Sequence, residues 1–109
     1  SVVAGTHDRR LLLSLNQICA ARVDGGHVLL VTETGELPTP YESLGELQKR
    51  LPEGAFFQVD RGCLVNLAKV REVHPLFNRT VQLVLADRQG TKIPVSRRRT
   101  GLLRELLQF

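Results

Sequence analysis

Short apolar segments separated by turn-forming residues most constrain the fold of this chain. Turn signals occur at Asp24-Gly25-Gly26, Thr34-Gly35, Asn78-Arg79 and Asp87–Gly90, and the segments between them are rich in Val and Leu. Such runs are typical of β-strands, and short turns between them predict antiparallel hairpins. We expect seven or eight short strands, over residues 10–15, 18–23, 27–32, 36–39, 58–61 continued by 64–65, 70–76, 81–85 and 92–95.

Two helices are expected beside these strands. Ser43 and Glu46 form an S-x-x-E capping box, followed by leucines at 44, 47 and 51 on one face, and Pro52-Glu53-Gly54 ends the helix. A C-terminal helix would present Leu102, Leu103, Leu106 and Leu107 as a single apolar stripe. The predicted class is therefore mainly β, with one short helix and a C-terminal helix.

The length of 109 residues suits one domain with one core. Residues 1–8 are small and polar without periodicity, and we interpret them as a linker or tag remnant, which leaves residues 9–109 as the domain. Methionine is absent even at position 1, so we expect the chain to be part of a longer protein, whose remaining part would sense a signal.

Charge is distributed unevenly along the chain. Residues 1–57 carry five basic and seven acidic residues, a net of −2, whereas residues 58–109 carry ten basic and four acidic residues, a net of +6. A globular half that is this basic indicates an acidic partner, most often nucleic acid or an anionic membrane; a merely solvated basic face is the alternative.

Several functional classes lack their sequence signals. No apolar run approaches the roughly 20 residues of a membrane span, and no signal-peptide pattern occurs. The nucleophile elbow, the P-loop and the metal-site spacings are all absent, so we expect no enzyme, no metal and no cofactor. Cys19 and Cys63 lie in apolar surroundings and are expected to be buried reduced thiols.

Two arginine segments carry the functional prediction: Arg61 ends the predicted strand 58–61, and Arg97-Arg98-Arg99 begin the final helix. Cations at a helix N-terminus are disfavoured by roughly 0.3–1 kcal/mol each, so three arginines there indicate an external anion. Planar guanidinium groups suit phosphate oxygens and guanine edges. We therefore expect nucleic acid as the partner.

Neighbouring polar residues have simpler interpretations. Asp60 could pair with Arg61 to hold a turn, in which Gly62 would supply a positive φ. Asn66 follows an apolar strand and is more typical of a backbone-capping residue than of a contact. His27 leaves the Gly-Gly turn and is expected to be exposed.

The order of these segments resembles one family. Phe57–Asn66 resembles the F-x-x-x-H-R-S-x-[IL]-V-N motif of LytTR-type (LytR/AlgR-like) DNA-binding domains, the output modules of many bacterial response regulators. Ile93–Arg97 resembles the closing V-S-R segment of that family, and the resemblance covers roughly residues 10–107. It implies an elongated arrangement of small antiparallel sheets, with loops that enter successive major grooves of double-stranded DNA.

The resemblance also implies the DNA-contacting residues. His27, Arg61 and Arg97 match the recognition positions of the family, and Arg79 and Arg98 are candidate phosphate contacts by charge. Asp60 and Gly62 depart from the usual His and Ser, which affects the expected operator sequence more than DNA binding itself. The family further implies paired or dimeric binding to tandem repeats, a sensor or receiver domain in the full-length protein, and a cytoplasmic location.

Two other classes of function are weighed against DNA binding. A PilZ-like β-barrel would bind an anionic nucleotide messenger through arginines, but the D-x-S-x-x-G turn of that family is absent. A basic β module that binds an acidic protein is the other alternative, and it would show little preference among DNA sequences.

Overall fold

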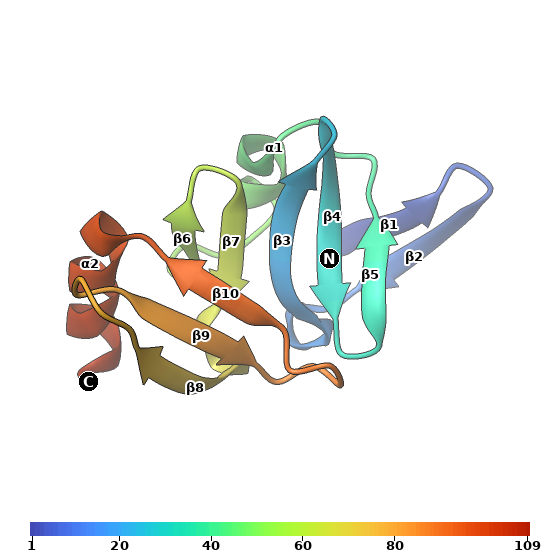
Figure 1. The fold of residues 1–109 in the computed structure, drawn as a ribbon. Coiled ribbons are helices and arrows are strands. Elements are labelled where there is room, and N and C mark those ends of the chain that lie inside the picture. The colour runs from blue at the N-terminus through green and yellow to red at the C-terminus, as the bar shows by residue number, and fades with distance from the viewer.

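A five-stranded antiparallel sheet forms the centre of the computed structural model, which describes residues 1–109. Its strands lie in the order β5 (Gly35–Pro38), β4 (His27–Thr32), β3 (Ile18–Asp24), β7 (Cys63–Asn66) and β6 (Phe56–Asp60). A three-stranded sheet of β10 (Lys92–Val95), β9 (Val81–Leu85) and β8 (Val70–Pro75) packs beside it (Figure 1). The dimensions of 44 × 26 × 25 Å and the small antiparallel sheets confirm the elongated, mainly β class.

The N-terminal residues differ from the expected linker. β1 (Val2–Thr6) pairs with β2 (Arg9–Leu13), and the side chains of Val2 and Ala4 are fully buried. A Cβ atom on Gly5 would lie 2.2 Å from the carbonyl oxygen of Arg9, so glycine is required there. Two inward residues are too short a pattern to predict a strand, which explains why β1 is not evident in the sequence.

β2 therefore pairs with β1 and not with the strand that follows it. A short 3-10 helix, η1 (Leu15–Gln17), connects β2 to β3, which were expected as consecutive strands over residues 10–15 and 18–23. The ten observed strands exceed the expected seven or eight because β1 is added and because β6 and β7 are separate strands.

The central sheet is covered on both faces. Alternate residues of β3, β4 and β7 face a cluster with β1, β2 and α1 (Leu44–Gln48), in which Leu30, Leu64 and Leu47 are fully buried. The other face contacts the three-stranded sheet and α2 (Arg97–Leu107), with Val65, Leu83 and Leu103 fully buried. Burial on both faces makes the central sheet a rigid base for the turns at its ends.

Both helices differ from the sequence prediction: α1 ends at Gln48, before Leu51, and α2 buries fewer of its leucines than expected. The Ser43 side chain caps α1 by accepting from the Glu46 amide at 3.1 Å, while the Glu46 carboxylate accepts from the Glu42 amide at 2.9 Å. In α2, Leu103 is fully buried, but Leu102 and Leu106 are 46% and 59% exposed. The single leucine stripe is therefore wrong: the buried face follows the helical period through Thr100, Leu103 and Leu107.

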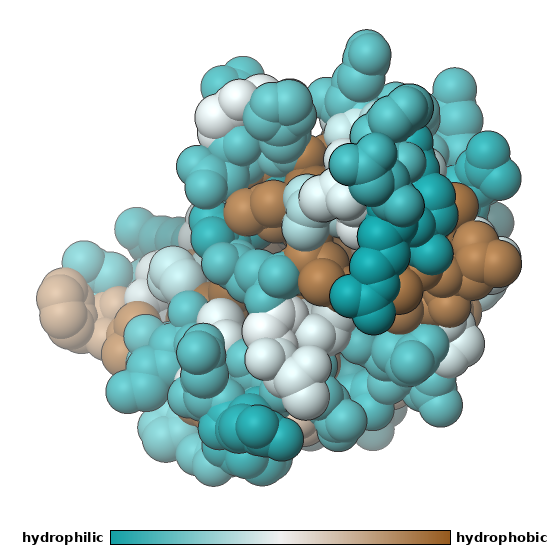
Figure 2. All heavy atoms as spheres, turned by 90° about the vertical axis from the view of Figure 1, so that its right-hand side faces the viewer, coloured by the Kyte–Doolittle hydropathy of each residue, from teal (hydrophilic) through white to brown (hydrophobic).

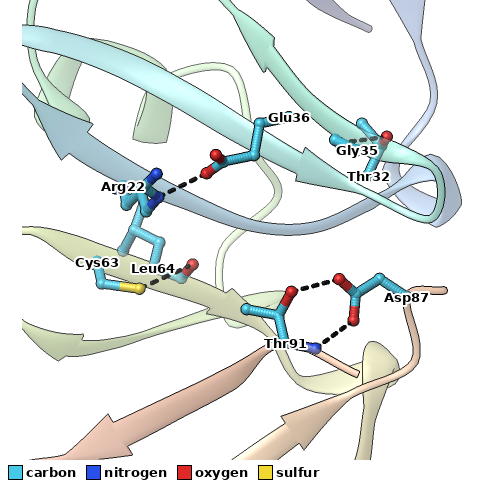
Figure 3. Close-up of polar contacts among 8 residues, drawn as sticks. All are labelled: Arg22, Thr32, Gly35, Glu36, Cys63, Leu64, Asp87 and Thr91. Carbon is cyan, nitrogen blue, oxygen red and sulfur yellow. Dashed lines mark hydrogen bonds and ion pairs between the residues drawn. The ribbon is translucent and has the colours of Figure 1, made fainter. Parts of the chain in front are cut away.

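A polar cluster lies where the central sheet and the β9–β10 loop approach each other (Figure 3). Arg22 donates to Glu36 across the sheet at 2.6 Å, and the buried Asp87 accepts from the Thr91 amide at 2.7 Å and from its hydroxyl. Arg22 and Glu36 form one pair, and Asp87 and Thr91 form another.

The right-hand end of the molecule in Figure 1 carries the β1–β2 hairpin. Figure 2 views this end and shows apolar patches among hydrophilic side chains. Leu12, which is 71% exposed, borders a groove between β2 and the segment after α1. None of the helices of the protein is long and apolar enough to cross a membrane.

Candidate nucleic-acid interface

Two turns of the central sheet and the start of α2 lie along one edge of the molecule. In Figure 1 the β3–β4 and β6–β7 turns are at the top, and α2 begins lower, at the left. β3 and β7 are antiparallel neighbours, so the end of β3 lies beside the start of β7. The Val23 amide donates to the Gly62 carbonyl at 2.9 Å. This bond holds the β3–β4 and β6–β7 turns next to each other.

The β3–β4 turn presents His27 from a rigid two-residue connection. Gly25 and Gly26 have φ values of +59° and +81°, as a type I′ hairpin requires. Asp24 and His27 form the last pair of the ladder, and the His27 side chain is exposed. The predicted hairpin and the predicted exposure are both confirmed.

The β6–β7 turn presents Arg61, and Asp60 holds its shape. The Asp60 Oδ1 atom accepts from the Gly62 amide at 2.8 Å, while Arg61 is exposed and forms no ion pair. The possible Asp60–Arg61 pair is therefore not formed, and Gly62 does not adopt a positive φ. The aspartate serves the backbone of the turn and leaves the guanidinium of Arg61 unpaired.

The first turn of α2 presents Arg97 and Arg98. Ser96 caps the helix by accepting from the Arg99 amide at 3.3 Å, and the side chains of Arg97 and Arg98 are exposed. Arg99 differs from them: its Nε donates to the Gln58 carbonyl at 2.7 Å, and its guanidinium lies 4.7 Å from the centre of the Phe57 ring. The arginine triplet therefore contains two outward cations and one that contacts the protein itself.

A groove of about 430 Å³ lies between the β6–β7 turn and α2, and no apolar residue lines it. Its lining residues are Gln58, Asp60, Arg61, Ser96, Arg98 and Arg99. Three arginines face one carboxylate, whose Oδ1 already accepts from the backbone. This composition suits an anion such as a phosphate group. His27 and Arg97 are not among the lining residues.

Arg79 lies apart from this groove. It occupies the β8–β9 turn, where Asn78 and Arg79 have φ values of +61° and +59°, and the Leu76 amide donates to the Thr80 carbonyl at 2.9 Å. In Figure 1 this turn lies at the left end, below the start of α2. The structure therefore brings Arg61 and Arg98 together and leaves Arg79 on another part of the surface.

Asn66 and Cys63 lie at the two ends of β7, and of the two only Cys63 adjoins the β6–β7 turn. Asn66 caps the 3-10 helix η2 (Leu67–Lys69) by accepting from the Ala68 amide, and its Nδ2 donates to the carbonyls of Leu15 and Ile18 at 3.1 and 2.8 Å. The predicted capping role is confirmed. Cys63 begins β7 with a buried free thiol, whose pKa is raised to about 12 by burial and by the nearby Asp60 carboxylate.

Cys19, the other free cysteine, is also buried, and its pKa is raised mainly by burial. Both cysteines are therefore buried thiols, as the sequence predicted. Sequence reasoning missed Arg99 as a contact of Phe57, because nothing local marks two residues so far apart as neighbours.

Comparison with known proteins supports the same fold and class. The family model described as LytTr DNA-binding domain matches residues 8–108. The chain superposes with a TM-score of 0.83 on the solved LytTr DNA-binding domain of a Bacillus cereus protein described as a methyl-accepting/DNA response regulator, at 23% identity. That match covers 99% of this chain and 96% of the other.

Curated relatives have different names and longer chains. The chain is 34% identical over 99 residues to the sensory transduction protein LytT of Bacillus subtilis (strain 168), covering 91% of this chain and 40% of the relative. It is 35% identical over 100 residues to the heme-containing CO-sensing transcriptional regulator RcoM 1 of Paraburkholderia xenovorans (strain LB400), covering 92% and 37%. The sequence spans about two fifths of the length of these relatives. With the family matched over residues 8–108, the chain belongs to the LytTr DNA-binding domain family.

Proposed function

We propose that this domain binds double-stranded DNA in a sequence-specific manner, as the output domain of a bacterial transcriptional regulator. The observation that carries the proposal is the edge on which the β3–β4 turn, the β6–β7 turn and the start of α2 lie together. Exposed cationic side chains on fixed backbone are suited to the phosphates and base edges of DNA.

Each residue has a proposed role at this edge. Arg61 and Arg97 would read bases, since bidentate arginine contacts to guanine are the commonest specific contacts in the major groove. Arg98, which lines the groove with Arg61, would hold a backbone phosphate. His27 would contact a base or a phosphate from the neighbouring turn. Arg79 would meet the DNA backbone only where the duplex extends past the left end of the edge.

The larger assembly is also a proposal. Two copies would occupy repeats about one helical turn apart, with the sites on one face of the duplex. The full-length protein would carry a sensor or receiver domain and act in the cytoplasm. The two relatives named above share this domain at similar identity but have different signalling descriptions, so the domain itself does not specify the signal.

The alternative binding functions receive less support. A second cleft contains Arg22, Glu36, Asp87 and Lys92, but Arg22 is paired with Glu36 and Asp87 is bonded to Thr91. It therefore lacks the unpaired arginine cluster that an anionic nucleotide messenger would need. A basic module for acidic proteins would use the same exposed arginines as DNA, and only the preference among DNA sequences separates these two functions.

Selection of bound duplexes from a random library tests the proposal most directly. We expect a defined site, together with the spacing of its repeats. The logarithm of the association constant for the selected duplex should fall linearly with the logarithm of the salt concentration, with a slope of roughly −0.9 for each phosphate neutralised. Binding that shows no sequence preference would exclude specific recognition, and salt-independent binding would exclude phosphate contacts. Calorimetry with cyclic dinucleotides would test the nucleotide-messenger alternative.

A further inference from the structure

Arg99 makes two specific contacts with β6, the edge strand of the central sheet. Its Nε donates to the Gln58 carbonyl oxygen at 2.7 Å, and its guanidinium carbon lies 4.7 Å from the centre of the Phe57 ring. Arg97 and Arg98, its neighbours in the same helical turn, make no corresponding contact and are more exposed. The three arginines therefore divide into two outward side chains and one that binds the fold.

The contact suits arginine in particular. A guanidinium group stacks flat on an aromatic ring while its N–H groups donate in the plane, which a lysine ammonium cannot do. An edge strand also has backbone groups without a partner in the sheet, and Arg99 supplies a donor to one of them. These contacts offset the unfavourable position of a cation in the first turn of a helix.

The contact also joins two parts of the fold that carry different DNA-facing residues. α2 follows β10, a strand of the three-stranded sheet, whereas β6 belongs to the central sheet. Gln58 lies three residues before Arg61, at an irregularity in the β6–β7 ladder, and Arg99 follows Arg98 directly. The Arg99–Gln58 bond therefore joins the two sides of the groove that carry the two arginine segments.

We infer that Arg99 is a positioning residue, which fixes the spacing between Arg61 on the β6–β7 turn and Arg97 and Arg98 on α2. The inference rests on the proposed function. Successive bases on one strand are about 3.4 Å apart along the helix axis. A displacement of α2 relative to the central sheet by a similar distance would therefore move Arg61 or Arg97 away from the base that it contacts. Arg99 would act by positioning Arg61, Arg97 and Arg98. Its own Nε already donates to the Gln58 carbonyl, and one face of its guanidinium lies over the Phe57 ring.

The test measures affinity for the selected duplex and for random duplex, at several salt concentrations, with four variants. Arg99→Lys keeps the charge but loses the stack and the directed bond, Arg99→Gln loses the charge as well, and Phe57→Leu removes the ring only. Arg98→Gln is the matched control, one residue away, exposed and without an internal contact. Differential scanning calorimetry confirms that each variant is folded at the assay temperature.

We expect Arg99→Lys to lower the ratio of specific to random affinity about tenfold, which corresponds to 1.4 kcal/mol, and to leave the salt slope unchanged. Phe57→Leu should lower the same ratio, and the double variant should lose less than the sum of the two. Arg98→Gln should instead weaken both duplexes equally and reduce the salt slope by roughly 0.9.

An Arg99→Lys variant with wild-type affinities, beside an Arg99→Gln variant that loses affinity for both duplexes equally, would overturn the inference and make Arg99 a phosphate contact. A lower melting temperature with an unchanged affinity ratio would assign Arg99 to stability alone. If the wild type showed no preference for any duplex, the proposed function itself would fail. If Arg99→Lys did not fold, the ratio measured with Phe57→Leu would decide the inference.

Discussion

The backbone amide of Val23 donates to the carbonyl oxygen of Gly62 at 2.9 Å. Because of this bond, the two turns that carry His27 and Arg61 are neighbours although they are more than thirty residues apart in sequence. Each turn is held by its own local device, a pair of left-handed glycines in one and the Asp60 carboxylate in the other. Gly25, Gly26 and Asp60 shape the backbone of this edge, whereas the side chains of His27 and Arg61 are exposed.

Arg97→Ala should have opposite effects on folding and on binding. Removal of a cation from the first turn of α2 should leave the free energy of unfolding unchanged or raise it by up to about 1 kcal/mol. DNA binding should weaken by about 1–3 kcal/mol, with specificity relaxed at one base pair, if Arg97 makes a bidentate contact with guanine. Chemical denaturation and repeated duplex selection measure the two effects. Equal loss on all duplexes would assign Arg97 to the backbone.

Asp60 should oppose DNA binding while it supports the turn. Asp60→Asn keeps an oxygen that can accept from the Gly62 amide and removes a negative charge beside Arg61, so affinity for any duplex should rise, most clearly at low salt. Asp60→Ala removes the bond as well and should lower the free energy of unfolding by about 1 kcal/mol. Titrations at two salt concentrations check the first effect. Weaker binding by Asp60→Asn would indicate that the carboxylate itself contacts a base.

The Nδ2 group of Asn66 should contribute more to the free energy of unfolding than its Oδ1 atom, which caps η2. Asn66→Asp keeps the oxygen that accepts from Ala68 but replaces the donor to the carbonyls of Leu15 and Ile18 with a second oxygen. We expect it to lower the free energy of unfolding by at least as much as Asn66→Ala, on the order of 1–3 kcal/mol. Urea denaturation compares them. A near-neutral Asn66→Asp would show that the cap dominates.

Stability should decrease above the ordinary pKa of a thiol. Cys63 ionises near pH 9.0 when unfolded but has a raised pKa of about 12 in the folded protein, owing mainly to burial. Folding therefore favours the protonated thiol of Cys63. The contribution of this thiol to the free energy of unfolding is fully present below pH 9 and is lost as the pH rises toward 12. The Cys63→Ala variant should show a shallower decline of the free energy of unfolding between pH 8 and 11. Parallel curves would exclude this cause.

Much of the architecture could be predicted because its causes are local. The β3–β4 turn follows from Gly25-Gly26, and the α1 cap from Ser43 and Glu46, since each needs only a few adjacent residues. The family motif predicts that Arg61 and Arg97 contact DNA, and the chain belongs to that family. The assignment of individual residues to bases and phosphates remains a prediction.

The sequence by itself determined the approximate positions of most strands, the tight β3–β4 turn, and where cationic side chains concentrate. Only the tertiary structure decided that residues 2–6 form a strand, that Asp60 bonds to the backbone of its turn, and that Arg99 contacts Phe57. Burial of β1 depends on the rest of the N-terminal core, and the Arg99 contact joins residues 41 or more positions apart. Periodicity and capping patterns report interactions within one element, whereas these features arise when separate elements pack together.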